Sequence, residues 1–348
     1  MQNLVSAFAP KVAESFKQSS LTDSARGTAF SFTGVRTLKV MSVDTVPLND
    51  YQRSGISRYG APVELGDTVQ ELTMREDKSF AMTIDKGNQS DQLNLKGAAQ
   101  AMRRQTEQVM VPYVDKYRFR QWSENAGIIV PLAADPAKGT IVDLLFDAGA
   151  EMSNRLVPTT KRTLFIRNSI YKLLKASNEI IGNDALGKKV ITKGSVGEFD
   201  GMDVKAIPDS YFPEGVYFLI KYKGSTVDPV KLNEANIHQD PPGISGHLLE
   251  GRFYHDAFVL GSKADGLYAA VKKDSQTAVP TVAEASGKVT LTCAGATIYY
   301  TLDGSDPRYS DKAQVYSAPF DVPGAGTTLK AYGAKSGLFK SGVVAKAY

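Results

Sequence analysis

Residues 69–84 decide the fold, and they read VQELTMREDKSFAMTI. Apolar and polar residues alternate on both sides of the charged segment 75–79, a pattern that predicts two strands joined by a turn. If the strands pair around this turn, one face carries Leu72, Met74, Phe80, Met82 and Ile84. A lone two-stranded ribbon is marginal in water. We therefore expect another element or another subunit to cover this face.

A long helical pattern follows over residues 91–124, and Ser90 or Asp91 can cap its start. Apolar residues recur at spacings of three and four from Leu95 to Tyr117, which predicts an amphipathic helix. At 1.5 Å per residue the helix is about 50 Å long, a length typical of a strut. Pro112 is expected to kink it, and the alternative is two shorter helices broken at this proline.

The flanking segments predict an α+β body with interleaved elements. Residues 1–29 form a Ser-rich arm without a clear core pattern, and residues 30–43 predict a strand with a bulge at Gly34. Helices are expected at 139–154 and from Asn168 to Ile180. Strands are expected at 163–166, 190–192, 202–207, 216–221, 251–258 and 266–270.

The character of the chain changes near Lys272. Residues 274–280 predict a linker. Residues 281–348 carry short strand patterns separated by turn residues, which is typical of a small β-sandwich. These strands are expected at 288–293, 297–302, 319–322, 328–333 and 342–347.

Composition limits the function classes. The chain has 348 residues, 42% hydrophobic and 22% charged, as in ordinary globular proteins. Its net charge of +4 is too small to indicate general nucleic-acid binding. The basic clusters at 103–104, 116–120 and 161–162 favour a solvated face or an interface rim. No apolar run approaches the roughly 20 residues of a membrane span. The single cysteine, Cys293, excludes an intrachain disulfide framework.

The chain carries no convincing catalytic, cofactor-binding or metal-binding motif. His238, His247 and His255 lack the spacing of a zinc site. Residues 182–189, GNDALGKK, match the first seven positions of a phosphate-binding loop, but Lys189 stands where magnesium needs Ser or Thr. Residues 303–307 are ordinary turn chemistry rather than a calcium loop. We therefore predict that the protein is not an enzyme, and that it uses no metal or cofactor.

The order of elements over residues 1–273 resembles the major capsid proteins of tailed phages, which have the Hong Kong 97-type fold. The segments GRFYHDAFVL at 251–260, GLY at 266–268 and FDGMDV at 199–204 are similar to parts of such proteins. The resemblance implies a division into an N-terminal arm (1–29), a first strand with an extended loop (30–90), a peripheral domain with a spine helix (91–126 and 223–273) and an axial domain (127–222).

In that family the extended loop lies over a neighbouring subunit, and the resemblance gives this role to residues 63–86. The expected inter-subunit residues are Leu72, Met74, Arg75, Glu76, Asp77, Lys78, Phe80, Met82 and Ile84. Some relatives crosslink a lysine of the loop to a distant asparagine. Lys78 and Lys86 are candidate donors, but no motif marks a partner, so no crosslink is predicted.

The resemblance implies a shell subunit that forms pentamers and hexamers around the double-stranded DNA of a tailed bacteriophage, without sequence-specific DNA contacts. Assembly is expected in the host bacterial cytoplasm, the mature location is the virion, and no membrane is involved. Only 29 residues precede Phe30. We therefore expect an unprocessed amino end, a separate scaffolding protein and a portal.

The C-terminal unit has its own resemblance. The segments YYTLDGSDP (299–307), YSAPF (316–320), TTLKAY (327–332) and KSG (335–337) are similar to the immunoglobulin-like domain at the end of chitobiase-type glycosidases. On a capsid, residues 281–348 would be an outward decoration, and glycan adhesion is a hypothesis. Two alternatives stay open: an encapsulin-like compartment of the same fold, and a carbohydrate-binding surface protein.

Overall fold

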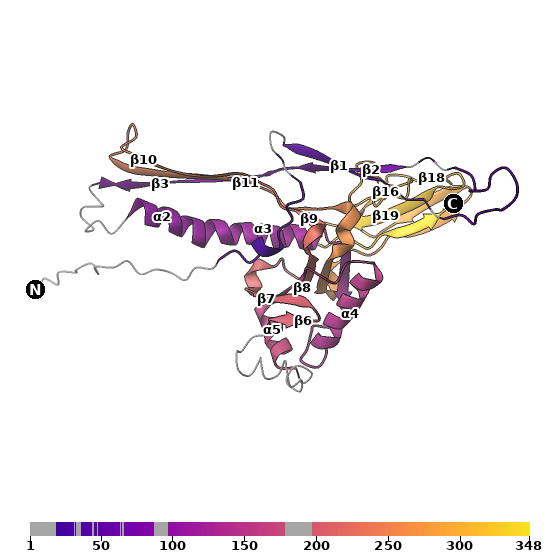
Figure 1. Cartoon of the computed structure of the whole chain (residues 1–348), viewed down its shortest axis with the longest axis horizontal. Coiled ribbons are helices and arrows are strands. Elements are labelled where there is room, and N and C mark those ends of the chain that lie inside the picture. The colour runs from indigo at the N-terminus through magenta and orange to yellow at the C-terminus, as the bar shows by residue number, and fades with distance from the viewer. Residues whose placement is uncertain are drawn as a thin grey trace, which may run out of the picture.

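The computed structural model describes residues 19–177 and 197–348, apart from 31, 33–35, 44, 47, 63, 65 and 87–96. Figure 1 shows an elongated molecule with a central body. A long helix and a narrow sheet extend from the body in one direction. A strand pair and a C-terminal β-module extend in the opposite direction.

The strands around the deciding segment do not form the predicted hairpin. β2 (Asp67–Thr73) pairs with the earlier strand β1 (Thr37–Val43), with Thr37 opposite Thr73. β3 (Glu76–Asp85) pairs with β11 (Gly246–His255), which also pairs with β10 (Val230–Gln239). The predicted pairing of residues 69–74 with 79–84 is therefore wrong. Alternation specifies which face of a strand is apolar, but it does not name the partner strand.

The spine helix is continuous over the described residues 98–124. It consists of α2 (Ala98–Gln105), a π-helical turn η2 (Thr106–Met110) and α3 (Val111–Glu124). Val111 donates its N–H to Thr106 O across the wider turn. Proline lacks an N–H, and its ring clashes with the carbonyl four residues earlier in an α-helix. A π turn directly before Pro112 lets the helix continue, so the break considered at this proline does not occur.

The body is a six-stranded sheet in the order β4-β13-β8-β5-β7-β6. α4 (Ile141–Asn154) and α5 (Asn168–Lys175) contribute Leu145, Met152 and Leu174 to the core on one face. Phe119 and Trp122 of the spine helix pack against the other face. The strands are β4 (Ile128–Leu132), β5 (Arg162–Arg167), β6 (Glu198–Phe199), β7 (Met202–Ile207), β8 (Val216–Tyr222) and β13 (Leu267–Lys272).

The return segment, residues 223–273, is divided among three sheets, one of which is the short pair of β9 (Thr226–Val227) and β12 (Phe258–Val259). β10 and β11 join β3 in the narrow sheet, but β13 lies inside the body sheet, between β4 and β8. The expectation that all of residues 223–273 rejoin the peripheral domain is therefore wrong for β13. Leu267 to Val271 are buried without interruption, as an interior strand covered on both faces requires.

Short elements complete this part of the chain: η1 (Asp23–Ala25), η3 (Asp209–Tyr211), η4 (Lys223–Ser225), β9 (Thr226–Val227), β12 (Phe258–Val259), η5 (Gly261–Gly266) and η6 (Lys273–Ser275). The predicted bulge at Gly34, the strand at 190–192 and the segment 182–189 lie outside the described residues.

The C-terminal module, residues 281–348, has two antiparallel sheets. One contains β14 (Thr281–Ala285), β15 (Lys288–Thr292) and β18 (Phe320–Asp321). The other contains β17 (Gln314–Val315), β16 (Thr297–Thr301), β19 (Thr328–Ala334) and β20 (Val344–Ala347). Their shared core includes Val289, Leu291, Ile298 and Leu329. The five predicted strands are present, and β14 and β17 were not predicted.

Candidate assembly surfaces

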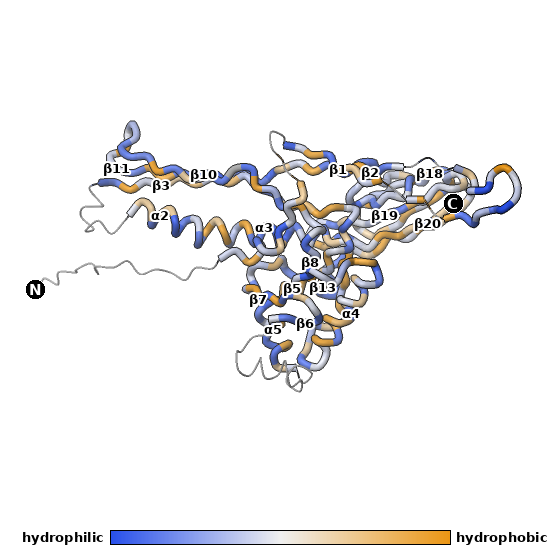
Figure 2. Tube along the Cα trace, viewed as in Figure 1, coloured by the Kyte–Doolittle hydropathy of each residue, from blue (hydrophilic) through white to orange (hydrophobic). Residues whose placement is uncertain are grey.

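The strand pair β1–β2 and its connecting segment form an arm that we call the loop arm, residues 37–73. Its far end is turned back by hydrogen bonds, with Gln52 N donating to Arg58 O at 2.9 Å. Large apolar side chains on it are fully open to solvent: the relative exposure is 101% for Leu48, 104% for Ile56 and 84% for Tyr59. Figure 2 shows hydrophobic stretches among hydrophilic ones along this segment. Apolar residues gathered on one exposed arm indicate a surface for another protein chain.

All the predicted inter-subunit side chains except Leu72 lie outside the loop arm, and three of the predicted set are buried within their own chain. Leu72 and Met74 pack with Val227 and Leu260 at the base of the loop arm. Ile84 packs beneath Met102 of the spine helix. These three side chains are not available to another subunit. Their burial follows from β2 and β3 each using its apolar face against a segment distant in the sequence.

Phe80 and Met82 are half-buried against the same spine helix. The Phe80 ring lies over Gly251, where an added Cβ would come within 2.3 Å of the ring. Because part of each side chain stays exposed, a contact of Phe80 and Met82 with another subunit stays a prediction.

The charged residues of the predicted turn form intrachain contacts on the narrow sheet. Asp77 accepts hydrogen bonds from Arg252 Nε at 3.0 Å and Nη2 at 2.5 Å, and this contact lowers the pKa of the Asp77 carboxyl. Tyr113 Oη donates to Glu76 Oε2 at 2.7 Å. Arg75 and Lys78 are exposed. Their role between subunits, with that of Glu76 and Asp77, stays a prediction.

A buried carboxylate of the spine helix holds the N-terminal arm. Asp115 accepts hydrogen bonds from Ser20 Oγ, Leu21 N and Thr22 Oγ1, at 2.8, 2.8 and 2.5 Å. One turn later, Arg118 Nη1 donates to Thr22 Oγ1 and pairs with Asp23 at 2.7 Å. Buried charges persist in proteins when such partners satisfy them. The arm therefore belongs to the folded structure from Ser20 onward, although its sequence shows no core pattern.

The arm is fixed a second time where it reaches the body. Asp228 accepts hydrogen bonds from Gly27 N at 2.8 Å and from Trp122 Nε1 at 2.8 Å. Lys221 donates to Ala25 O at 2.7 Å and lies 4.6 Å from the centre of the Trp122 ring. Burial lowers the pKa of Lys221 to about 8. Residues far apart in the sequence thus build this anchor, and no local pattern could have revealed it.

His255 is buried between the narrow sheet and the spine helix. Its ring contacts Tyr117 edge-on at 5.2 Å and Phe253 at 4.7 Å between ring centres. Neither ring nitrogen has a hydrogen-bond partner within the described part of the chain. Burial, together with the nearby Arg118, lowers the pKa of His255 to about 4. The folded protein therefore holds this imidazole neutral.

This environment predicts a loss of stability in mild acid. An ordinary histidine with pKa 6.5 takes up a proton in the unfolded chain before folded His255 does. The free energy of unfolding should therefore fall as the pH drops from about 6.5 to about 4, by about 3 kcal/mol in total. Chemical denaturation at several pH values measures this. Burial raises the pKa of Asp256, which opposes this trend. The pH dependence of the wild-type chain is therefore compared with that of His255→Phe, which keeps Asp256. An unchanged pH dependence in that variant would refute the assignment to His255.

The C-terminal module is docked onto the end of the spine helix. Tyr309 Oη donates to Asn125 O at 2.9 Å, and Arg308 Nη1 donates to Gly127 O at 3.0 Å. Lys340 Nζ donates to Asn125 Oδ1 at 2.7 Å. The last carbonyls of a helix lack intrahelical partners and favour positive charge. Tyr309 therefore caps the C-terminal end of the spine helix, and Arg308 and Lys340 bind groups directly around this end.

The predicted linker at 274–280 is part of this contact. Gln276 Nε2 donates to Ile129 O at 3.3 Å in the body and to Lys340 O at 3.0 Å in the module. Phe339 is 7% exposed and belongs to the body core together with Phe119 and Trp122. Asp311 N also donates to Val69 O of the loop arm at 3.2 Å. The predicted linker is therefore in contact with both units, and the apolar packing of Phe339 fixes the module against the body.

The histidines singled out in the sequence do not converge on one site. His238 Nε2 lies 3.3 Å from Glu250 on the exposed narrow sheet, whereas His255 is buried. Across the ranges that the structure describes, no group of three or more His, Cys, Asp or Glu side chains is placed to hold a metal ion. Asp303 accepts hydrogen bonds from Ser305 N and Oγ, at 3.0 and 2.5 Å, as a turn residue does. Among the described helices, none is both long and apolar enough to cross a bilayer.

Solved phage structures share this fold. A chain of Mycobacterium phage Che8 has a TM-score of 0.66 at 13% identity, over 77% of this chain and 97% of that one. The capsid of the cyanophage P-SCSP1u has a TM-score of 0.65 at 12% identity, over 78% of this chain and 93% of that one. The mature capsid of bacteriophage PhiM1 has a TM-score of 0.62 at 12% identity, over 78% of this chain and 92% of that one. The predicted α+β architecture of a phage capsid protein is thus confirmed at the level of fold.

Comparisons of sequence reach only the C-terminal part. Residues 289–348 match the family model described as Fn3 associated, which is compatible with an immunoglobulin-like module. No curated protein matches the chain.

Proposed function

We propose that this chain is the major capsid protein of a tailed bacteriophage, a structural subunit rather than an enzyme, which assembles with copies of itself into an icosahedral shell around double-stranded DNA. The observation that carries the proposal is the fold shared with the cyanophage P-SCSP1u and PhiM1 capsids over more than nine-tenths of their chains. The exposed apolar side chains of the loop arm support it, because a shell subunit needs surfaces that only its neighbours cover.

Within this proposal the extended loop is the loop arm, residues 37–73, rather than residues 63–86. The spine helix and the narrow sheet of β3, β10 and β11 form the peripheral domain, and the body with α4 and α5 forms most of the axial domain. In Figure 1 the loop arm and the narrow sheet point away from each other across the body. This separation favours a head-to-tail contact, in which one surface of a subunit meets a different surface of the next. Such contacts form closed rings when the rotation from each subunit to the next divides a full turn evenly.

The remaining parts of the proposal concern the assembled particle. Pentamers and hexamers build the shell, with a separate scaffolding protein and a portal as partners, and DNA is enclosed without sequence-specific contacts. Assembly takes place in the host bacterial cytoplasm and the mature location is the virion. The C-terminal module lies on the shell surface, docked beside the base of the loop arm.

Electron microscopy of the purified full chain, alone and co-expressed with the scaffolding protein of the same phage, tests the proposal. Closed icosahedral shells of uniform size are the expected result. Shells that form without a scaffolding protein and enclose a protein cargo would favour an encapsulin-like compartment instead. A chain that stays monomeric under both conditions would refute the assembly function.

A further inference from the structure

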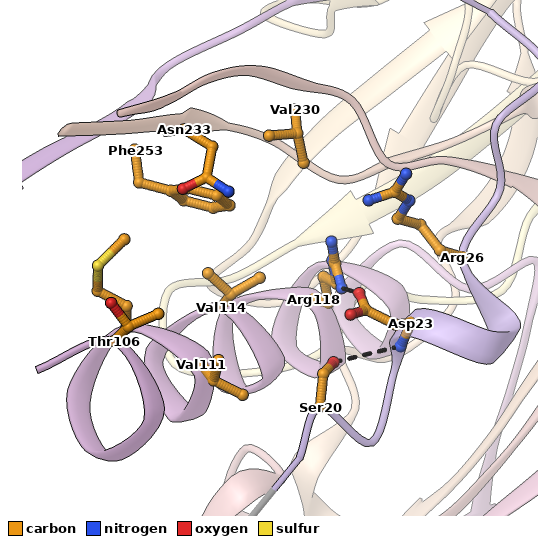
Figure 3. A pocket seen from close by; sticks show the side chains of 11 residues that line it. Ser20, Asp23, Arg26, Thr106, Val111, Val114, Arg118, Val230, Asn233 and Phe253 are labelled. Atoms are coloured by element: carbon orange, nitrogen blue, oxygen red, sulfur yellow. Dashed lines mark hydrogen bonds and ion pairs between the residues drawn. The ribbon is translucent and has the colours of Figure 1, made fainter. Parts of the chain in front are cut away.

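A pocket of about 200 Å³ lies where the N-terminal arm, the spine helix and strands β10 and β11 meet. Figure 3 shows Arg26 and Arg118 at the same end of this pocket, with Val111 and Val114 of the helix along one side. Val230 and Phe253 of the strands close the opposite side. The pocket thus has one cationic end and mixed walls, in which Ser20, Thr106 and Asn233 lie among the apolar side chains.

One of the two guanidinium groups at the cationic end lacks a carboxylate partner among the described residues. Only 2% of the Arg118 side chain is exposed. Its Nη1 donates a hydrogen bond to Thr22 and pairs with Asp23. Its buried Nε has no partner among the described residues. Arg26 lines the same end without a hydrogen bond or ion pair to the described chain. Asp23 pairs with Arg118, and the buried Asp115 lies behind them on the other side of Thr22, so Arg26 is the guanidinium left without a carboxylate partner among the described residues. Like charges gathered in a partly closed pocket favour the entry of an anion.

The walls and the size restrict which anion fits. Thr106 and Met110 of the π-helical turn line the pocket, and π turns inside α-helices often mark functional sites. A volume of about 200 Å³ is below the range for drug-sized ligands. It suits one short side chain or a small acid. Valine and phenylalanine walls favour an aliphatic stem over a phosphate or a sulfate.

We propose that this pocket binds a carboxylate carried on a short aliphatic stem. The carboxylate would contact Arg26, because guanidinium and carboxylate groups match in geometry and charge, and the buried Arg118 beside it would add positive charge. The stem would lie against Val114 and Phe253. A glutamate side chain of a neighbouring copy and a free small carboxylic acid share this chemistry. The inference that a neighbouring copy supplies the carboxylate rests on the proposed function. The inference that a free acid binds does not.

Saturation-transfer NMR on the unassembled full chain tests the pocket, with butyrate as probe and butylamine as the cation with the same stem. We expect saturable binding of butyrate and no saturable binding of butylamine. The Arg26→Gln variant should bind butyrate about tenfold more weakly, because it loses one charge-assisted hydrogen bond. Arg120→Gln is the matched control, because it removes the same charge from the spine helix beside Arg118, where Arg120 pairs with Glu124 outside the pocket. No saturable binding, equal binding of butylamine, or an unchanged affinity in Arg26→Gln would overturn the proposal.

A second measurement identifies the source of the carboxylate. If a neighbouring copy supplies it, assembled shells should no longer bind butyrate, and Arg26→Gln should weaken assembly. If the natural ligand is a free acid, assembled shells should bind butyrate as the subunit does. Failure of the chain to form shells would count against the proposed function, but the measurement on the unassembled chain would still decide whether the pocket binds carboxylates.

Discussion

Replacing Leu48 and Ile56 with serine is expected to leave the subunit folded and to prevent shell formation. Both side chains are fully exposed, so the free energy of unfolding should change by no more than about 0.5 kcal/mol. In a shell, burial of each such side chain contributes about 1.5–3 kcal/mol. The double variant then loses about 3–6 kcal/mol at every copy of the contact, which shifts each association constant by a factor of roughly 10² to 10⁴.

Thermal unfolding measures the subunit, and sedimentation with electron microscopy measures the shells. The matched control is Ser54→Ala with Ser57→Ala, which changes two neighbouring exposed side chains of the same loop arm without removing apolar area. The control should assemble normally. Normal shells from the Leu48 and Ile56 variant would mean that the loop arm does not carry the inter-subunit contact.

Deleting residues 276–348 is expected to destabilise the rest of the protein strongly. The deletion removes Phe339 from the body core and removes the donors of Arg308 and Tyr309 from the end of the spine helix. Burial of one phenylalanine contributes about 1.5–3 kcal/mol, and each lost hydrogen bond about 0.5–1.5 kcal/mol. The sum is about 3–6 kcal/mol, a large share of the 5–15 kcal/mol that stabilises a typical domain.

Circular dichroism on heating and the soluble yield of the truncated chain measure this loss. Phe339→Ala in the full chain should reproduce much of it, because a large buried side chain leaves a cavity. Lys346→Ala is the control, since Lys346 is in the same module but pairs with the exposed Glu284 away from the body. A truncated chain that unfolds at the same temperature as the full chain would show that the module is an independent decoration.

Local patterns predicted the elements well where one face of each element is buried. The helix expected at 139–154 is found at Ile141–Asn154, and the strand expected at 202–207 has those bounds. The spine helix also follows its apolar stripe near the body. Farther out, Met102 is buried against the narrow sheet, whereas Val109 remains 51% exposed.

Local patterns failed where a contact joins distant segments. The alternation of Phe80, Met82 and Ile84 is real, but their partner strand lies at 246–255, and nothing in residues 69–84 indicates it. The apolar residues Leu48, Ile56 and Tyr59 stand among glycines and polar residues, a composition typical of an ordinary loop. β1 and β2 have seven residues each in the structure, a match that the strand predicted at residues 30–43 did not indicate.

The position of β13 also has a consequence for how the chain reaches its native state. β13 pairs in parallel with β4, about 140 residues earlier, and in antiparallel with β8. While the ribosome is still making the chain, β4 lacks its partner, and the inner edge of β8 stays open until residues 267–272 emerge. Pairings of such sequence separation slow folding, and open strand edges invite aggregation. Refolding from denaturant should therefore be slow, and its yield should fall steeply with protein concentration.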